Sequence, residues 1–89
     1  MSGRTIVITG NVQGVFFRDR TKVMAKEFGV KGWVKNTHDG AVEIHAEGTE
    51  EALQKLEEWC HLGPAAAHVE NVEVKEAEEE GHKEFEIIW

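Results

Sequence analysis

A glycine-bearing loop that ends on an arginine is the first part of this sequence that could do chemistry. It runs from Gly10 to Arg18, reads GNVQGVFFR and lies between a predicted strand and a predicted helix. Backbone N–H groups in such a loop can form a concave nest for an anion, and the helix that follows adds the positive end of its dipole. The planar guanidinium of Arg18 matches phosphate or carboxylate. The loop therefore predicts an anion pocket; the alternative is a glycine-shaped turn with solvated bases.

The cations around this loop favour the anion pocket. Arg18, Arg20 and Lys22 cluster at the start of the predicted helix, where they oppose the helix dipole at a cost of about a few tenths of a kcal/mol each. A local rule that is broken without visible gain often marks a functional site. Neither G-x-x-x-x-G-K-[ST] nor G-x-G-x-x-G occurs, so the sequence does not support a nucleotide-binding loop of either kind.

A second segment, GWVKNTHDG, begins at Gly32 and places Asn36 at the end of a predicted strand. The carboxamide of Asn36 can both donate a hydrogen bond to a water and accept one from it. Capping the backbone is the commoner role for an asparagine beside a turn, and spacing alone does not decide between the two roles. His38, two residues further on, is interpreted as an exposed hairpin histidine.

Together the two segments resemble the signatures of the acylphosphatase family. The first signature, Gly-x-Val-Gln-Gly-Val-x-(Phe/Tyr)-Arg, is matched throughout from Gly10 to Arg18. The second, Gly-aromatic-Val-(Lys/Arg)-Asn followed by spaced Gly, Val and Gly, is matched from Gly32 to Gly48. A downstream Gly-Pro pair and the C-terminal Phe-x-Ile also resemble the family, so the resemblance spans nearly all of the chain.

The resemblance implies an enzyme that hydrolyses the carboxyl–phosphate bond of acyl phosphates without a metal, a cofactor or a covalent intermediate. By motif position, the catalytic residues would be Arg18, which binds the phosphoryl oxygens, and Asn36, which holds the attacking water. Phe16 occupies a variable motif position and could line the acyl side of the pocket. Inorganic phosphate or sulfate is the anion expected to bind there. The implied phosphate-binding residues are Gln13, Gly14, Val15, Phe16, Phe17 and Arg18.

The elements that must position these segments follow from the hydrophobic pattern. Strands are predicted at residues 4–9, 31–36, 41–47, 69–74 and 85–89, with helices after residues 18 and 48. The order β-α-β-β-α-β plus a terminal strand is the ferredoxin-like, split-βαβ arrangement of the α+β class. It implies an antiparallel sheet with both helices on one face. We expect residues 1–89 to form a single acylphosphatase-like domain.

Local signals set the expected helix ends. Asp19 is the predicted N-cap of the first helix and Gly29 its C-cap. Thr49 is the predicted N-cap of the second helix, which a Gly-Pro pair at Gly63 ends.

The strand at residues 41–47 alternates apolar and polar residues, so one face is expected to be buried and the other wet. An Asp-Gly pair just before it predicts a hairpin with the preceding strand. The strand at residues 69–74 has an imperfect period, which suggests a bulge.

Composition narrows the possible functions. The 89 residues carry a net charge of −7, but residues 1–40 hold seven bases and three acids, whereas residues 41–89 hold three bases and fourteen acids. The acidity argues against a general nucleic-acid binder, while the basic first half still allows an anion site.

The lone Cys60 excludes an intramolecular disulfide, and no Cys/His spacing predicts a metal site. We expect a monomeric cytoplasmic protein that binds neither nucleic acid nor membrane.

Several conspicuous residues are given structural roles. Cys60 is expected to be a small buried hydrophobe, and the acidic run at residues 76–80 a solvated surface. The tryptophans Trp33, Trp59 and Trp89 are expected to pack in or against the core.

Two other functions remain open from the sequence. One is a binding module that keeps the phosphate cradle but turns over little, as in acylphosphatase-like domains of larger maturation proteins. The other is an RNA-binding domain of the same architecture, which needs aromatic residues on a central strand and a basic face. The strand at residues 41–47 has no aromatic residue, and the net charge is wrong for RNA.

Overall fold

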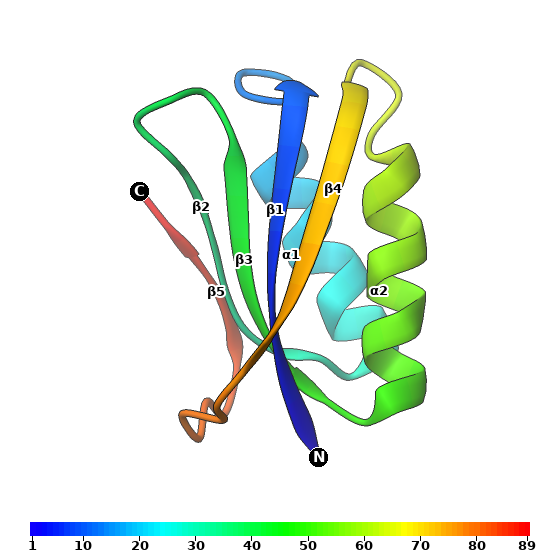
Figure 1. Cartoon of the computed structure of the whole chain (residues 1–89), viewed down its shortest axis with the longest axis vertical. Helices are drawn as coiled ribbons and strands as arrows, with labels where there is room; N and C mark the ends of the chain where they lie inside the picture. Colours follow the sequence, from blue (N-terminus) through cyan, green and yellow to red (C-terminus); the bar gives the residue numbers. More distant parts are fainter.

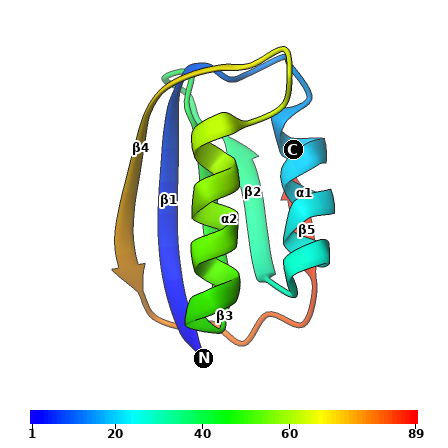
Figure 2. The same ribbon diagram turned by 90° about the vertical axis from the view of Figure 1, so that its right-hand side faces the viewer.

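A computed structural model describes the whole chain, residues 1–89. Two helices cover one face of a five-stranded sheet (Figures 1 and 2). This confirms the ferredoxin-like β-α-β-β-α-β order with a terminal strand. Neither helix is long and apolar enough to cross a membrane. The elements are β1 (Ser2–Asn11), α1 (Phe17–Phe28), β2 (Lys31–Asn36), β3 (Val42–Gly48), α2 (Glu50–Leu62), β4 (His68–Ala77) and β5 (Phe85–Ile88).

The strands lie in the order β4-β1-β3-β2-β5. The first four form antiparallel pairs, as predicted, whereas β5 pairs with β2 in parallel and makes that edge of the sheet mixed. In this register Lys35 pairs with Ile88. The chain therefore carries Trp89, the next residue, alongside the end of β2 where Asn36 lies.

The core fills the space between the sheet and the helices. Cys60 is fully buried there, and desolvation raises the pKa of its thiol to about 12, so it behaves as the small hydrophobe that was predicted. The main apolar residues of this core are Ile6, Ile8, Val34, Val42 and Ile44 from the sheet and Phe17, Ala25, Leu53 and Leu56 from the helices.

The start of α1 differs from the sequence prediction. Phe16, not Asp19, is the N-cap residue, with a left-handed backbone (φ 66°) and no side-chain cap. Burial explains the earlier start, because Phe17 is fully inside the core and its carbonyl accepts a hydrogen bond from the Thr21 hydroxyl (2.7 Å). The predicted C-cap is confirmed: Gly29 is left-handed (φ 77°), and its N–H reaches the last carbonyls of the helix.

Thr49 caps α2 as predicted, since its hydroxyl accepts the N–H of Ala52 (3.1 Å). Replacing Thr49 with alanine should therefore lower the free energy of unfolding by about 1 kcal/mol, measured by urea denaturation. Thr49→Ser is the matched control, because it keeps the oxygen and should stay within about 0.5 kcal/mol of the parent. An equal loss in both variants would mean that the methyl group, not the cap, matters.

The prediction of a wet outer face on β3 is wrong at two positions. His45 is 4% exposed and Glu47 is 2% exposed, because the segment 78–84 between β4 and β5 folds over them. Glu47 accepts the backbone N–H groups of Glu80 (2.5 Å), Gly81 (3.2 Å) and His82 (3.2 Å).

These bonds keep Glu47 ionised. Burial alone would raise the pKa of Glu47, but hydrogen bonds from the Glu80 amide, His45 and the His82 amide outweigh it, so its pKa lies below the usual value of 4.5. Ionised Glu47 therefore favours the folded state at neutral pH. That contribution is lost as the pH falls below about 4.5 toward the lower folded-state pKa.

Two further details of the sheet bear on the sequence predictions. The predicted bulge in β4 is confirmed. Thr9 pairs with Asn71 and Gly10 pairs with Val69, so Glu70 is the extra residue without a partner in β1. The motif glycine Gly32 is needed for close packing, because a Cβ there would lie 1.8 Å from the carbonyl oxygen of His45.

Candidate active site

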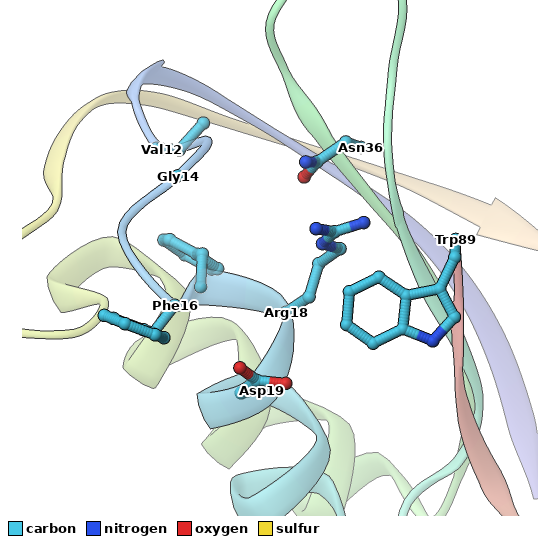
Figure 3. Close-up of a pocket in the computed structure, with 8 residues that line it drawn as sticks. Val12, Gly14, Phe16, Arg18, Asp19, Asn36 and Trp89 are labelled. Carbon is cyan, nitrogen blue, oxygen red and sulfur yellow. The ribbon is translucent and has the colours of Figure 1, made fainter.

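A pocket of about 240 Å³ lies where the loop after β1, the start of α1, the end of β2 and the C-terminal residue meet (Figure 3). It contains both predicted catalytic residues, Arg18 and Asn36. The first comes from the first turn of α1 and the second from the end of β2. Its lining residues are Val12, Gly14, Phe16, Phe17, Arg18, Asp19, Asn36 and Trp89.

Free backbone amides surround one side of this pocket. The backbone N–H of Arg20 is the first in α1 to find a carbonyl partner, the Phe16 oxygen (3.1 Å). The backbone N–H groups of residues 14–19 donate to no protein acceptor. Gly14 (φ 75°) and Phe16 (φ 66°) are both left-handed, and Phe16 is the only non-glycine residue of the chain with positive φ. Such strain, of order 1 kcal/mol, clusters at ligand-binding sites. The loop is therefore a nest whose donors are available to an anion.

The guanidinium of Arg18 is also free. It forms no ion pair with any carboxylate of the chain. It points toward Asn36 and lies beside the Trp89 ring, with Cζ 4.4 Å from the ring centroid (Figure 3). The face of an aromatic ring attracts a cation without using its N–H donors, so the donor fork of Arg18 stays available for a ligand.

Trp89 is the pocket residue that the sequence analysis misassigned. It was expected to pack in or against the core, but it is 81% exposed and forms one wall of the pocket. Trp33 and Trp59 are half-buried, as expected. The parallel pairing of β5 with β2 places Trp89 here, and no local signal in the sequence encodes the direction of that pairing.

The carboxamide of Asn36 does not cap the neighbouring turn. The turn is closed by Thr37, whose hydroxyl accepts the N–H of Ala41 (3.0 Å), while the Thr37 N–H donates to the Ala41 carbonyl (2.9 Å). The side chain of Asn36 makes no hydrogen bond within the chain. The carboxamide group of Asn36 therefore has no protein partner, and it lies across the pocket from the loop after β1 (Figure 3).

Gln13 joins the two halves of the site. Its Nε2 donates to the carbonyl oxygens of Thr37 (2.8 Å) and Ala41 (2.8 Å), so the loop after β1 is tied to the β2–β3 turn. Gln13 and Val15 do not line the pocket, unlike the other four residues of the predicted phosphate-binding set. The resemblance pointed to the Gln13 amide, whereas the structure shows a bridging side chain.

Replacing Gln13 with alanine should lower the free energy of unfolding by about 1–2 kcal/mol, because two carbonyls lose a donor. Loosening the tie should also reduce phosphate release about tenfold, since the loop and Asn36 are no longer held together. Urea denaturation and steady-state kinetics would measure the two effects. Gln54→Ala, on the exposed face of α2, is the matched control and should change neither quantity appreciably.

Not every base of the first half of the chain contributes to the pocket. Arg20 lines a neighbouring hollow with Phe16 and Trp59. Arg4 pairs with Glu57 (3.1 Å) and Glu50 on α2. The only arginine or lysine side chain that lines the pocket is Arg18.

His38 is exposed in the hairpin, as predicted, and lines a separate hollow to which Asn36 also contributes. It does not line the pocket that contains Arg18.

Comparisons with known proteins show the family of this chain. The family model for acylphosphatase matches residues 4–87. The acylphosphatase of Chloroflexus aurantiacus is 51% identical over 85 residues, which cover 94% of this chain and 92% of that protein. The crystal structure of the acylphosphatase from Bacillus subtilis matches with a TM-score of 0.97 at 41% identity, over the full length of both chains. T. kodakarensis HypF matches with a TM-score of 0.87 at 32% identity, over all of this chain but 12% of that one. The chain belongs to the acylphosphatase family.

Proposed function

We propose that this enzyme hydrolyses the carboxyl–phosphate bond of acyl phosphates by direct attack of a water that Asn36 positions. The phosphoryl group is held by Arg18 and by backbone amides of the loop before α1. The observation that carries the proposal is the convergence of three unused groups in one pocket: the backbone amides of Gly14 and residues 16–19, the guanidinium of Arg18 and the carboxamide of Asn36.

These three groups are sufficient for the proposed reaction. A carboxylate is a good leaving group, so catalysis consists of orienting a water in line and stabilising negative charge on the transferring oxygens. Fixed amides and the Arg18 fork supply that stabilisation without reorganising during the reaction. The Asn36 amide can donate to the attacking water and accept from it, which fixes the direction of its lone pair.

The proton of the water does not need a protein base. Asparagine cannot accept it at neutral pH, and no histidine lines the pocket. The one carboxylate that lines it, Asp19, lies on the far side of Arg18 from Asn36 (Figure 3). Solvent or the substrate's own phosphate therefore takes the proton. In the pH dependence of kcat/KM, the expected signature is the absence of an ionisation from a histidine or a carboxylate of the enzyme.

The decisive measurement is release of inorganic phosphate from benzoyl phosphate and acetyl phosphate, with and without a chelator. We expect turnover of both, competitive inhibition by inorganic phosphate and no loss of activity with chelator. The likeness to one eighth of the much longer HypF chain keeps a binding module as the alternative. Phosphate binding without turnover of either substrate would support that module and reject the enzyme.

Added salt should leave kcat/KM for benzoyl phosphate within about threefold between low and physiological ionic strength. The acidic half of the sequence forms β3, α2, β4, the segment before β5 and β5 itself, and only its last residue, Trp89, lines the pocket. The pocket is instead built around the N-terminus of α1 (Figure 3). Salt weakens long-range repulsion and attraction together, while Arg18 acts at contact distance. A steep fall of kcat/KM with salt would show that long-range attraction dominates substrate capture.

A further inference from the structure

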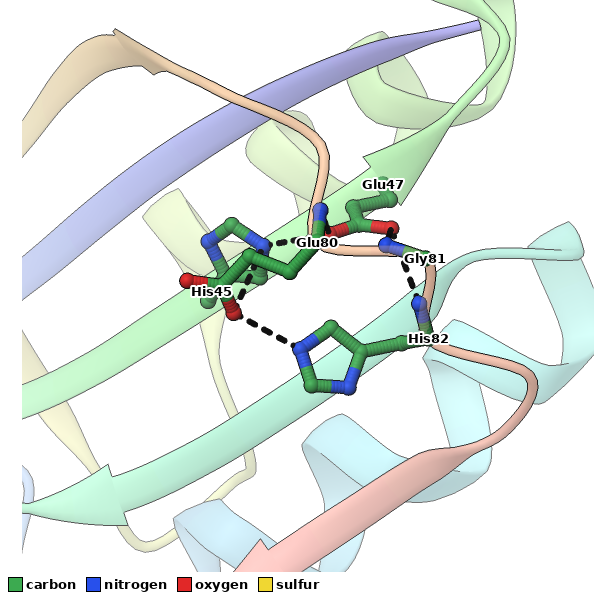
Figure 4. A network of polar contacts seen from close by, with 5 residues as sticks. All are labelled: His45, Glu47, Glu80, Gly81 and His82. Carbon is green, nitrogen blue, oxygen red and sulfur yellow. Dashed lines mark hydrogen bonds and ion pairs between the residues drawn. The ribbon is translucent and has the colours of Figure 1, made fainter.

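Two histidines and two glutamates meet on the sheet face that the helices leave open. His45 and Glu47 come from β3, and Glu80 and His82 from the segment 78–84 that folds over them (Figure 4). One nitrogen or oxygen from each residue lies within 4.8 Å of all the others. None of the four residues lines the pocket that holds Arg18 and Asn36.

We propose that this His45–Glu47–Glu80–His82 cluster is a structural zinc site. Two imidazole nitrogens and two carboxylate oxygens are a donor set that Zn²⁺ takes in four-coordinate sites. The two carboxylates supply negative charge that a divalent ion neutralises. Zinc takes the place of the hydrogen between His45 Nε2 and Glu47 Oε2, and that hydrogen moves by way of solvent to Nδ1 of the same ring, so His45 binds the ion as a neutral imidazole.

Three of the distances between ligand atoms lie within about 0.7 Å of those in a tetrahedral site. His45 Nε2 lies 2.6 Å from Glu47 Oε2 and 3.6 Å from Glu80 Oε1, and His82 Nε2 lies 2.8 Å from Glu80 Oε1. Ligand atoms on a tetrahedral zinc with bonds of about 2.0–2.1 Å are roughly 3.3 Å apart. To admit the ion, the two short contacts need to open by about 0.5–0.7 Å, and the widest separations, which are at most 4.8 Å, need to close toward the same value.

Part of the site is already held in place. The side chains of His45 and Glu47 are 6% and 3% exposed. The amides of Glu80, Gly81 and His82 fix the Glu47 carboxylate, as partners behind a metal ligand do. The His45 ring stacks on Trp33, with ring centroids 5.8 Å apart. Glu80 and His82 are the more exposed pair and leave a path for the ion.

Sequence spacing did not predict this cluster because its members come from two segments more than 30 residues apart, which only the fold brings together. Bound zinc would fasten the segment 78–84, and with it the start of β5, to β3. The expected effect is therefore on stability and not on turnover, which keeps the proposal independent of the proposed function.

The test is titration of the chelator-treated full chain with Zn²⁺, followed by calorimetry and thermal unfolding. We expect one ion per chain and a Tm rise of about 5 °C or more at a tenfold excess over Kd. His82→Ala and Glu80→Gln should each weaken binding at least about tenfold and remove most of the Tm rise. Release of phosphate from benzoyl phosphate should be unchanged in all of these proteins, with or without zinc.

His38→Ala is the matched control, since it removes an exposed histidine outside the cluster. It should bind zinc as the parent does. Absence of saturable binding to the parent chain would overturn the proposal. So would equal affinity in His82→Ala and the parent, or a loss in His38→Ala as large as that in His82→Ala. Glu80→Gln preserves the shape of the segment, so loss of binding there cannot be ascribed to misfolding around residue 82.

Discussion

Replacing Arg18 with alanine should remove most of the turnover of benzoyl phosphate and most of the affinity for inorganic phosphate. No other arginine or lysine lines the pocket, and no carboxylate of the chain engages the Arg18 guanidinium. Its fork would contact the phosphoryl oxygens both in the bound substrate and in the transition state. We expect kcat/KM to fall about a thousandfold or more. Phosphate should bind about ten- to a hundredfold more weakly, since charge-assisted hydrogen bonds contribute about 1.5–3 kcal/mol.

Two variants separate the role of this side chain from a general effect of charge. Arg20→Ala removes a base two residues further along α1 that lines the neighbouring hollow, so activity should stay within about threefold of the parent. Arg18→Lys keeps the charge but loses the planar fork, and it should recover only a small part of the rate. If Arg18→Ala kept near-parent turnover, or if Arg20→Ala fell as far, Arg18 would not be the phosphate ligand.

The parts of the fold that the sequence predicts well depend on short-range patterns. The strand predicted at residues 31–36 matches β2, and the caps at Gly29 and Thr49 lie where local preferences put them. Arg18 and Asn36 were singled out together because the family motifs contain both. The ends of strands next to glycines and the ends of helices next to capping residues can therefore be predicted from the neighbouring residues alone.

The errors share a different cause. Asp19 is a better N-cap than Phe16 by local preference, but the burial of Phe17 starts the helix earlier. Alternation in β3 predicted a wet face at His45 and Glu47, whereas a distant segment covers both. Trp89 joins the pocket through the parallel pairing of β5 with β2. In each case a contact between distant parts of the chain overrides the local preference.

Replacing Asn36 with alanine should lower the rate and leave phosphate binding nearly intact. The carboxamide makes no hydrogen bond within the chain, and Thr37 closes the adjacent turn, so its removal should not unfold the hairpin. Its proposed partner is the attacking water, which contributes to the transition state and not to the affinity for phosphate. We expect kcat to fall about a hundredfold or more, with the inhibition constant of inorganic phosphate unchanged within about threefold.

The contrast with Arg18 makes this prediction specific. Loss of a phosphate ligand changes both kcat and the phosphate inhibition constant, whereas loss of a water ligand changes kcat alone. Asn71→Ala, on exposed β4, is the matched control for removing an asparagine from a strand and should change neither. Near-parent turnover in Asn36→Ala would mean that Asn36 does not position the water. An equal loss of phosphate affinity would instead place the carboxamide on the phosphoryl group, and the loop amides would then be the remaining candidates for orienting the attacking water.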